Sequence, residues 1–529
     1  MLWAARRLRV LGVTAALLAL LGGCSANQRV PAGESSSAAP PLPAASSSAE
    51  SPKEERPLQP IPPVTPEGFT EPPPGNGLAR YEKQKLKWKS CGHGIFCSTM
   101  LVPLDYADPD GSAISILVAK RSATGSKRLG SLIINPGGPG GSGVWYVGYF
   151  NAAGLENFDV VGWDPRGVGQ STPVTCFGKD DLDHYFSMDS SPDDDGELQT
   201  RIDKQIAFGR SCLDRSGTLL EHISTMETVR DLELLRHLLG DSKINYFGSS
   251  YGTKIGALYA ELFPQRVGHM VLDGAVDINS KSKIAQVDGF ERALRHFAKW
   301  CADADCRLGS HRDDVLSKIS EFLDGLDQQP LAVTGGGRTL SQQQGVRAIF
   351  YAMYGGISSW PTLRDALTAA IFDGDGGRML QLADAADRRD RDGSYGQLNY
   401  AFPAIRCLDS QENSVRAVQK RLAKESRSAP VLGPLNGPDL LCALWPVKPA
   451  PKQPKVDAGG APPIVVIGTT GDPATPYEYA PLMARELSSA VLVTFNGEGH
   501  LAHGQSACVR ALVLAYLVRN VVPRDGTRC

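Results

Sequence analysis

One serine near the middle of the chain has the surroundings of a nucleophile. Ser250 is the centre of Gly248-Ser249-Ser250-Tyr251-Gly252, a Gly-x-Ser-x-Gly pattern. The pattern alone is weak, but here it follows the apolar run Ile244–Phe247 and opens a helical pattern. Small residues at such a strand-to-helix turn expose the serine hydroxyl above the sheet. We therefore expect Ser250 to act as a nucleophile; the alternative is a glycine-rich turn without chemistry.

An acid and a base follow later in the chain, each after a strand-like run. Asp472 lies in Gly471-Asp472-Pro473-Ala474-Thr475-Pro476, and His500 ends Gly497-Glu498-Gly499-His500. The order Ser, Asp, His is one of the orders in which a catalytic triad occurs. In that arrangement His500 takes the Ser250 proton, and Asp472 orients the imidazole and stabilises its charged form. The sequence thus predicts the triad Ser250, Asp472 and His500.

Two members of this triad have competitors. His503 lies three residues beyond His500 and is an alternative base, but the Gly-x-Gly-His context favours His500. We expect His503 to be a supporting or surface group. Asp273 and Asp277 follow the run Val267–Leu272, where some hydrolases place their acid, whereas Asp472 occupies the commoner position.

A glycine-rich loop after an early strand predicts the site that stabilises an oxyanion. Acyl transfer needs N–H donors aimed at the developing negative charge. One such donor follows the nucleophile, here Tyr251, and we assign the other to Gly138. The loop is Asn135-Pro136-Gly137-Gly138-Pro139-Gly140-Gly141-Ser142-Gly143. A phosphate-binding loop is the rival interpretation, but the Lys followed by Ser or Thr that it requires is missing.

The elements around these motifs alternate between strand and helix, which predicts an α/β fold with a mostly parallel sheet and helices on both faces. A long, mainly helical stretch interrupts the alternation and reads as a large cap insertion. Strands are expected at 113–118, 131–134, 158–162, 244–247, 267–272, 463–467 and 491–495, and helices at 225–239, 251–263 and 507–519.

Together the motifs resemble the tripeptidyl aminopeptidase-like α/β-hydrolases, secreted actinobacterial relatives of proline iminopeptidase that include envelope serine proteases and proteins labelled carboxylesterase. The resemblance covers roughly residues 85–529 and implies the same triad. The iminopeptidase branch has His where this chain has Pro136. Asp164 and Arg166 resemble the family's structural turn, not a catalytic pair. The matching motifs are Asn135 to Gly140, Asp164-Pro165-Arg166-Gly167-x-Gly169-x-Ser171, Gly248 to Gly252, Asp472-Pro473-x-Thr475-Pro476 and Gly499-His500.

The N-terminus predicts export and lipidation. Arginines precede a short apolar run that ends in Leu21-Gly22-Gly23-Cys24, which is typical of a signal peptide followed by a bacterial lipobox. We expect residues 1–23 to be cleaved and Cys24 to carry a lipid that anchors the protein to the outer face of the cell membrane. The remaining predicted units are a Ser/Pro/Ala-rich tether over 24–77, hydrolase core over 78–280, cap over 281–455 and hydrolase core over 456–529.

Charge and cysteine count agree with that compartment. The 529 residues carry a formal net charge of −2, so the basic excess of a nucleic-acid-binding protein is absent. Of 11 cysteines, one is assigned to the lipid, and ten invite disulfides in an oxidising compartment. Pairing in chain order is the simplest hypothesis. The spacing does not suggest a metal site, and we expect no cofactor. The ten are Cys91, Cys97, Cys176, Cys212, Cys301, Cys306, Cys407, Cys442, Cys508 and Cys529.

Substrate choice is expected to depend on the cap. An aminopeptidase needs a carboxylate for the substrate amine, and Asp409 and Glu412 are the candidates; the alternative is a solvated acidic turn. Three functions follow: a serine peptidase that releases short peptides from free N-termini or cuts oligopeptides, a carboxylesterase or lipase acting on envelope or host lipid esters, and a non-catalytic lipoprotein with a vestigial triad. The oligomeric state is left open. The aromatic residues of the cap, mostly expected in its core, are Trp300, Tyr351, Tyr354, Trp360, Tyr395, Tyr400, Phe402 and Trp445.

Overall fold

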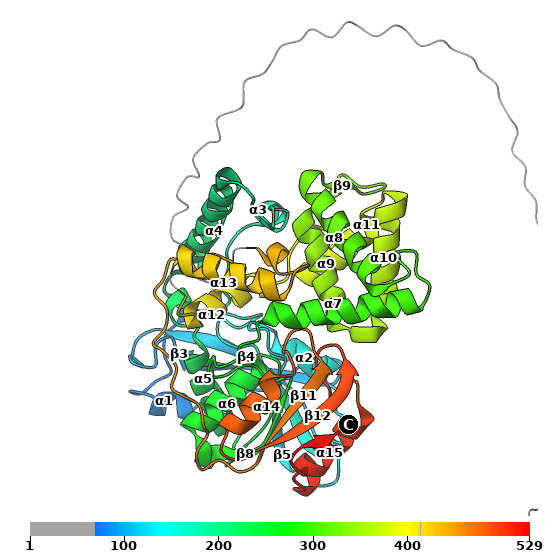
Figure 1. The fold of residues 1–529 in the computed structure, drawn as a ribbon. Coiled ribbons are helices and arrows are strands. Elements are labelled where there is room, and N and C mark those ends of the chain that lie inside the picture. Colours follow the sequence, from blue (N-terminus) through cyan, green and yellow to red (C-terminus); the bar gives the residue numbers. More distant parts are fainter. Residues whose placement is uncertain (1–68, 413, 438) are drawn as a thin grey trace, which may run out of the picture. The chain divides into compact units, whose positions relative to one another are not determined.

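The computed structural model describes residues 69–412, 414–437 and 439–529 (Figure 1). The predicted signal peptide, Cys24 and most of the predicted tether lie outside these residues. None of the helices in the described ranges is both long enough and apolar enough to cross a membrane.

The folded part begins earlier than residue 78. Strand β1 (Phe69–Thr70) pairs antiparallel with β4 (Ala113–Arg121), with Phe69 opposite Ile114. The Gly77 amide donates a hydrogen bond to Asp110 Oδ1 at 2.8 Å. The predicted tether boundary at residue 77 is therefore wrong. A two-residue strand among prolines and glycines is too short to give a periodic pattern, and it is held by pairing with β4 and by packing of Phe69 against the core.

Eleven strands of the described chain form one sheet, in the order β13-β12-β11-β8-β7-β5-β6-β4-β3-β2, with β1 also on β4. Strands β2 (Lys89–Gly92), β3 (Ile95–Pro103) and β4 form an antiparallel edge. This mostly parallel sheet confirms the predicted α/β fold class. The parallel strands are β5 (Gly130–Asn135), β6 (Phe158–Trp163), β7 (Ile244–Ser249), β8 (Val267–Asp273), β11 (Ile464–Gly471), β12 (Ala490–Glu498) and β13 (Thr527–Arg528).

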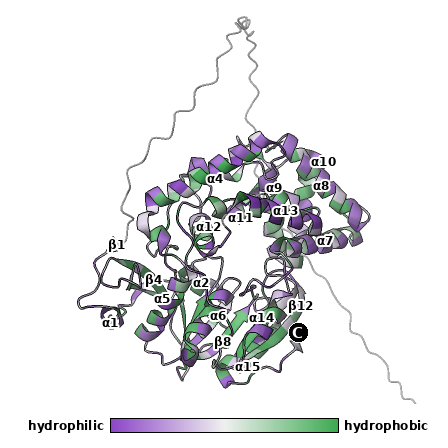
Figure 2. Ribbon diagram, turned by 60° about the vertical axis from the view of Figure 1, so that its left-hand side comes forward, coloured by the Kyte–Doolittle hydropathy of each residue, from purple (hydrophilic) through white to green (hydrophobic). Residues whose placement is uncertain are grey.

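Helices cover both faces of the sheet, which explains why its central strands are apolar throughout rather than alternating. On β5, Ile133 packs into one core, while Leu132 and Ile134 pack into the other. Figure 2 shows the sheet strands mostly in the hydrophobic colour. One face is covered by α5 (Thr225–Leu238), α6 (Gly252–Leu262) and α14 (Tyr479–Glu486), and the other by α2 (Gly143–Tyr149) and α15 (Ala507–Arg519).

The cap lies between β8 and β11 in the chain and has an apolar core of its own. Leu294, Phe297, Ile319, Ile349 and Leu363 are completely buried in it. The mixed colouring of these helices in Figure 2 fits amphipathic helices that bury one face. The cap helices are α7 (Gln286–Asp303), α8 (Arg312–Gln328), α9 (Gln342–Tyr354), α10 (Trp360–Asp373), α11 (Gly377–Asp387), α12 (Leu398–Asp409) and α13 (Val415–Ser428).

A second insertion contributes to the cap, which the sequence analysis did not anticipate. Helices α3 (Lys179–Phe186) and α4 (Asp195–Ser216) separate β6 from α5. The Asp183 carboxylate on α3 pairs with Arg389 at 2.7 Å and accepts a hydrogen bond from the Tyr395 hydroxyl at 2.7 Å. Residues 179–216, which were assigned to the hydrolase core, therefore contact the cap insertion.

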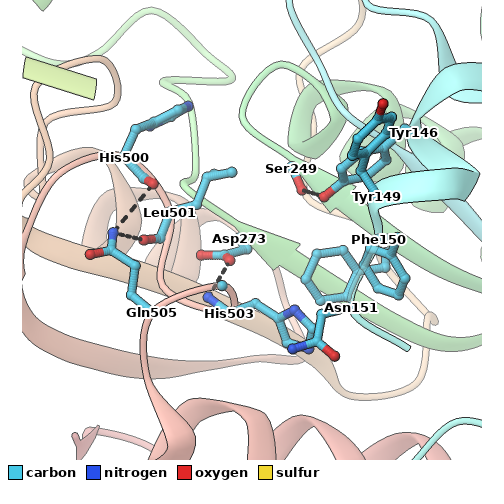
Figure 3. A pocket seen from close by; sticks show the side chains of 12 residues that line it. Tyr146, Tyr149, Phe150, Asn151, Ser249, Asp273, His500, Leu501, His503 and Gln505 are labelled. Carbon is cyan, nitrogen blue, oxygen red and sulfur yellow. Dashed lines mark hydrogen bonds between the residues drawn. The ribbon is translucent and has the colours of Figure 1, made fainter. Parts of the chain in front are cut away.

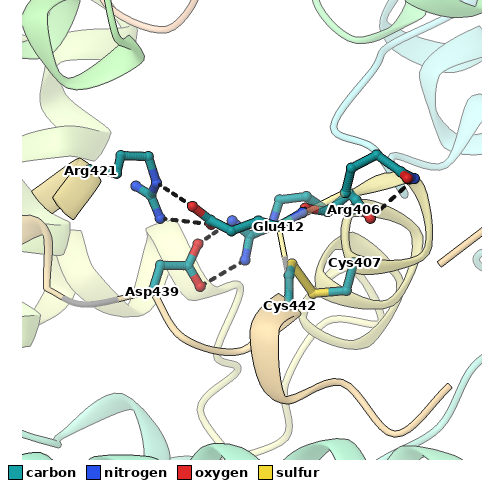
Figure 4. The surroundings of a disulfide bond; sticks show 8 residues. Arg406, Cys407, Glu412, Arg421, Asp439 and Cys442 are labelled. Carbon is teal, nitrogen blue, oxygen red and sulfur yellow. Dashed lines mark hydrogen bonds and ion pairs between the residues drawn. A yellow bond between two sulfur atoms is a disulfide. The ribbon is translucent and has the colours of Figure 1, made fainter. Parts of the chain in front are cut away.

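The ten cysteines pair in chain order, as the simplest hypothesis predicted. Figure 4 shows Cys407–Cys442, which joins α12 to the segment before the last core strands, beside ion pairs of Arg406 with Asp439 and Arg421 with Glu412. The other bonds are Cys91–Cys97, Cys176–Cys212, Cys301–Cys306 and Cys508–Cys529.

Candidate active site

Ser250 occupies the turn between β7 and α6 with a strained backbone. Its φ of 55° lies in the left-handed region, which non-glycine residues rarely adopt. A Cβ on Gly248 would approach the Gly252 carbonyl oxygen to 2.4 Å, so only glycine fits there. The Ser250 amide donates to the Asp273 carbonyl at 2.8 Å. Strain of this kind persists where the surrounding structure enforces it and is frequent at catalytic turns.

His500 and Asp472 form a buried, directly bonded pair. The Nδ1 atom of His500 lies 2.9 Å from Oδ1 and 3.0 Å from Oδ2 of Asp472. Burial lowers the pKa of His500, but the charge and hydrogen bond of Asp472, with a smaller contribution from Asp273, raise it more, so the net pKa is raised. The imidazole is thus oriented by its carboxylate and made more basic, as a general base requires.

The Asp472 carboxylate is itself held in place by backbone amides. Oδ1 accepts hydrogen bonds from the amides of Ala474 at 2.9 Å and Thr475 at 2.8 Å, and Oδ2 accepts one from Leu501 at 3.2 Å. These donors fix the orientation of the buried carboxylate. The turn after β11 therefore presents a fixed carboxylate to the histidine.

The same strand-end segment contacts both Ser250 and His500. Asp273 accepts the Ser250 amide, and a Cβ on the adjacent Gly274 would lie 3.4 Å from Cε1 of His500. The structure thus brings all three predicted triad residues to the carboxyl ends of neighbouring strands. This is the edge of a parallel sheet where ligands bind.

The competing acids have structural contacts instead. The buried Asp273 carboxylate accepts the amides of Ala502 at 3.0 Å and His503 at 2.9 Å, which fixes the loop after His500. Burial raises the pKa of Asp273 to about 6, against the effect of those amides. Asp277 accepts the amides of Lys281 and Ser282 and so closes a local turn.

The competing base is a buried neutral ring. His503 stacks on Phe150 with ring centroids 5.5 Å apart and an interplanar angle of 7°. Burial, with a smaller contribution from Arg510, lowers the pKa of His503 to about 4. The structure therefore supports His500 as the base and places His503 in a supporting position, not at the surface.

A cavity of about 170 Å³ opens beside His500 (Figure 3). One wall is the aromatic side of α2 with Tyr146, Tyr149 and Phe150, and the other is the loop of His500, Leu501 and Gln505. Figure 3 shows the hydrogen bond between the Tyr146 hydroxyl and Ser249, which is 3.2 Å long. Together with Phe247, the three aromatic residues at α2 give this cavity a partly aromatic lining.

The glycine-rich loop lies directly on the nucleophile turn, as predicted for an oxyanion site. Gly137 and Gly138 have φ values of 88° and 113°. A Cβ on Gly137 would come within 2.5 Å of the Ser249 carbonyl oxygen and 2.8 Å of the Tyr251 amide nitrogen. The Gly137 amide donates a hydrogen bond to Asn135 Oδ1 at 2.9 Å. Within the described chain, the amides of Gly138 and Tyr251 have no hydrogen-bond partner, so they are available to an oxyanion.

The two carboxylates assigned to the substrate amine already have cationic partners. Asp409 pairs with Lys254 at 3.1 Å and accepts the hydroxyls of Tyr251 at 2.7 Å and Thr225 at 2.5 Å. Burial raises the pKa of Asp409, but Lys254 and these hydrogen bonds lower it more, so it is lowered overall. Glu412 pairs with Arg421 at 3.2 Å. The structure argues against both assignments, because each carboxylate is neutralised within the protein. Lys254 is distant from Asp409 in the sequence and gave no signal, whereas Arg421 lies only nine residues after Glu412.

Asp164 and Arg166 have the structural role that the resemblance implied. Asp164 accepts Ser142 at 2.5 Å and the amide of Gln170 at 2.9 Å, which ties the start of α2 to the turn after β6. Arg166 is completely buried and pairs with Asp231 at 2.7 Å.

Two clusters in the described residues have metal-binding residue types: an exposed acidic one, Asp193, Asp194 and Glu197, and a partly buried one that includes a histidine. Ligand atoms of Asp105, His222 and Glu227 lie within 4.8 Å of one another. Glu227 is already bonded to His222 Nδ1 at 3.2 Å and faces the Arg166 guanidinium at 3.5 Å. The positive guanidinium of Arg166 already balances the negative charge of Glu227 that a metal ion would need as a ligand. We therefore assign no metal to this cluster.

The cap contributes a contact that the sequence analysis did not single out. Tyr354, the last residue of α9, accepts the His500 amide on its carbonyl oxygen at 2.9 Å. Its ring meets the imidazole edge to face, with centroids 5.3 Å apart and an angle of 89°. Tyr354 was among the cap aromatics expected mostly in the cap core; it is 43% exposed and lies beside the catalytic histidine.

Comparison with known proteins agrees with this geometry. The family model described as "alpha/beta hydrolase fold" matches residues 130–300, and the "TAP-like protein" model matches residues 429–529. Serine protease Hip1 of Mycobacterium tuberculosis is 35% identical over 491 residues, which cover 86% of this chain and 93% of that protein. Carboxylesterase B of the same organism is 36% identical, covering 84% and 89%, and the tripeptidyl aminopeptidase of Streptomyces lividans is 32% identical, covering 85% and 88%.

With these matches over most of its length, the chain belongs to the tripeptidyl aminopeptidase-like α/β-hydrolases.

Proposed function

We propose that this α/β-hydrolase is a serine peptidase that cleaves short peptides through an acyl-enzyme. The observation that carries the proposal is the buried Asp472–His500 pair at the strand edge that also holds the strained Ser250 turn. Two of the three relatives compared above are named as a protease and an aminopeptidase, which favours peptides over esters.

The reaction follows from the groups present. His500 removes the Ser250 proton as the hydroxyl oxygen bonds to the substrate carbonyl carbon. The resulting oxyanion is stabilised by the amides of Gly138 and Tyr251. His500 then gives its proton to the leaving amine as the C–N bond breaks. Water, deprotonated by His500, attacks the acyl-enzyme and releases Ser250.

A carboxylesterase is the second candidate, favoured by the 36% identity to a protein of that name and by the aromatic walls of the cavity beside His500. The same triad would hydrolyse an ester, since only the leaving group differs. Envelope or host lipid esters would be the substrates in that case.

The decisive experiment compares Ser250→Ala with Ser249→Ala. Both remove a hydroxyl from the same buried turn, but the Ser249 hydroxyl contacts Tyr146 instead of the active centre. We expect Ser250→Ala to lose hydrolysis of a tripeptide anilide and of p-nitrophenyl esters with an unchanged melting temperature, and Ser249→Ala to keep most of it. Full turnover by Ser250→Ala would overturn the mechanism.

Substrate class is tested with free and N-acetylated tripeptide anilides and with short- and long-chain esters. A fall in peptide turnover on acetylation indicates recognition of the free amine, as an aminopeptidase requires. Equal turnover of both peptides contradicts the aminopeptidase form. Turnover of long-chain esters without any peptide cleavage would favour the carboxylesterase.

We also propose that the protein acts outside the cytoplasm, attached to the cell membrane by a lipid on Cys24. The sequence Leu21-Gly22-Gly23-Cys24 and the five disulfides support this placement. In a bacterial host fed an alkyne fatty acid, the wild type should carry the label and sediment with membranes. Equal labelling and sedimentation of Cys24→Ala would contradict the proposal.

A further inference from the structure

The catalytic histidine is held by the cap as well as by the sheet domain. His500 follows β12 on an irregular loop, and its amide donates to the carbonyl of Tyr354 at 2.9 Å. Tyr354 ends α9, and carbonyl groups in the last turn of a helix have no partner within that helix. The C-terminal end of α9 thus offers an acceptor to the His500 backbone.

The two segments meet through glycines that leave no room for a side chain. Gly356 follows α9 with a φ of 56°, and a Cβ there would lie 2.5 Å from the Glu498 carbonyl oxygen. Gly499 has a φ of 92°, and a Cβ there would lie 2.9 Å from the Gly356 amide nitrogen and 3.0 Å from the Tyr354 carbonyl oxygen. Each segment therefore requires a glycine to let the other backbone approach.

Two side-chain contacts flank this backbone contact. The Tyr354 ring meets the His500 ring edge to face. Nδ1 of His296 on α7 lies 2.9 Å from the carboxylate of Glu498, and Glu498 precedes His500 by two residues. The partial negative charge at the C-terminal end of α9 also favours the imidazolium that forms when His500 accepts a proton.

We propose that residues Tyr354 to Gly356, the cap corner, are positioning residues that hold His500 in its catalytic orientation. The cap is then part of the catalytic machinery at this corner and not only a wall that selects substrates. The inference rests on the proposed serine-hydrolase function, because it assigns a role through His500.

The test compares Gly356→Ala with Gly374→Ala in the full-length protein. Gly374 is also a cap glycine with positive φ, at 70°, but a Cβ there would meet no atom within 4 Å. The two variants therefore share the backbone penalty and differ in the contact with the His500 loop. A displacement of about 1 Å at a catalytic group costs about 100-fold in rate. We expect kcat of Gly356→Ala to fall about 100-fold with KM within threefold of wild type, and Gly374→Ala to keep wild-type kcat.

A second pair of variants keeps the proposal testable if Gly356→Ala does not fold. Tyr354→Ala removes the ring beside His500, whereas Tyr354→Phe retains it. The interaction energy of an aromatic edge-to-face pair corresponds to about a 2- to 10-fold change in rate. We therefore expect Tyr354→Ala to lower kcat by that factor and Tyr354→Phe to keep the wild-type kcat.

The outcomes separate this inference from the proposed function. If the wild type neither turns over the substrates nor reacts at Ser250 with a fluorophosphonate, the proposed function is wrong. If the wild type is active but Gly356→Ala matches Gly374→Ala, and Tyr354→Ala matches wild type, the inference is wrong and the proposed function stands.

Discussion

Replacing Asp472 by Asn tests whether this carboxylate selects the working form of His500. Oδ1 faces the amides of Ala474 and Thr475, so that position must remain an oxygen in the variant. The new NH2 group then takes the place of Oδ2, 3.0 Å from His500 Nδ1 and opposite the Leu501 amide. Oδ1 also lies 2.9 Å from Nδ1, but it already accepts two amide hydrogen bonds, so we expect the NH2 group to determine the tautomer. An N–H facing Nδ1 makes that nitrogen an acceptor and leaves the ring proton on Nε2, which then cannot receive the Ser250 proton.

The size of the effect follows from this tautomer change. The same substitution in a serine protease triad lowers kcat by about 10⁴ while the geometry stays intact. His500 and Asp472 are in direct hydrogen-bond contact, so we expect a loss of similar size, equal to about 5 kcal/mol of activation free energy. The assay is kcat on a tripeptide anilide, with thermal melting as the check that the variant is folded.

Asp277→Asn is the matched control. It removes one carboxylate charge near the same strand ends, but Asp277 only closes a turn through Lys281 and Ser282. We expect its kcat to stay within about threefold of wild type, because Asp277 is not among the charged groups that shift the pKa of His500. Asp472→Asn with more than a tenth of wild-type activity, or Asp277→Asn as impaired as Asp472→Asn, would refute the assignment of the acid.

Two further predictions concern pH and the disulfides. Activity requires neutral His500, so it should fall as the pH drops through the raised pKa of this residue. The negative charge of Asp273 contributes to the raised pKa of His500. Asp273→Asn should therefore move the acid limb of the pH–rate profile to lower pH. An unshifted limb in this variant would contradict the electrostatic contribution. The Cys407–Cys442 bond closes a loop with a sequence separation of 35 residues, whereas the separation for Cys91–Cys97 is 6. Because the longer loop restricts the unfolded chain more, replacing both cysteines by Ser should lower the free energy of unfolding by about 4 kcal/mol for the first pair and about 2 kcal/mol for the second. Denaturant titration measures both losses. Equal losses for the two pairs would contradict the loop-entropy argument.

Local sequence patterns predicted the triad because each proposed member follows a strand whose apolar run is visible without any tertiary information. The run Ile244–Phe247 is mostly buried and Val491–Phe495 is buried or half-buried, and the residues just beyond such runs are expected at the carboxyl edge of a parallel sheet. The glycines of the predicted oxyanion loop were also visible, since the backbone conformation they permit is a local property.

The substrate-amine assignment failed for the opposite reason. Asp409 is neutralised by Lys254 and Tyr251, which lie more than 150 positions away, and no local pattern encodes such a contact. The contact of α3 with the cap depends in the same way on Asp183 meeting Arg389, about 200 residues later.

The fold class, the order of the proposed triad residues and the cysteines available for pairing could be read from the sequence alone. Strand burial, glycine turns and residue chemistry depend on residues that are close together in the chain. Only the tertiary structure decided which carboxylates are free and where the folded part begins. It also showed that the cap reaches the catalytic histidine through Tyr354 and Gly356. Those properties depend on which distant segments meet, and such contacts arise only when the whole chain packs.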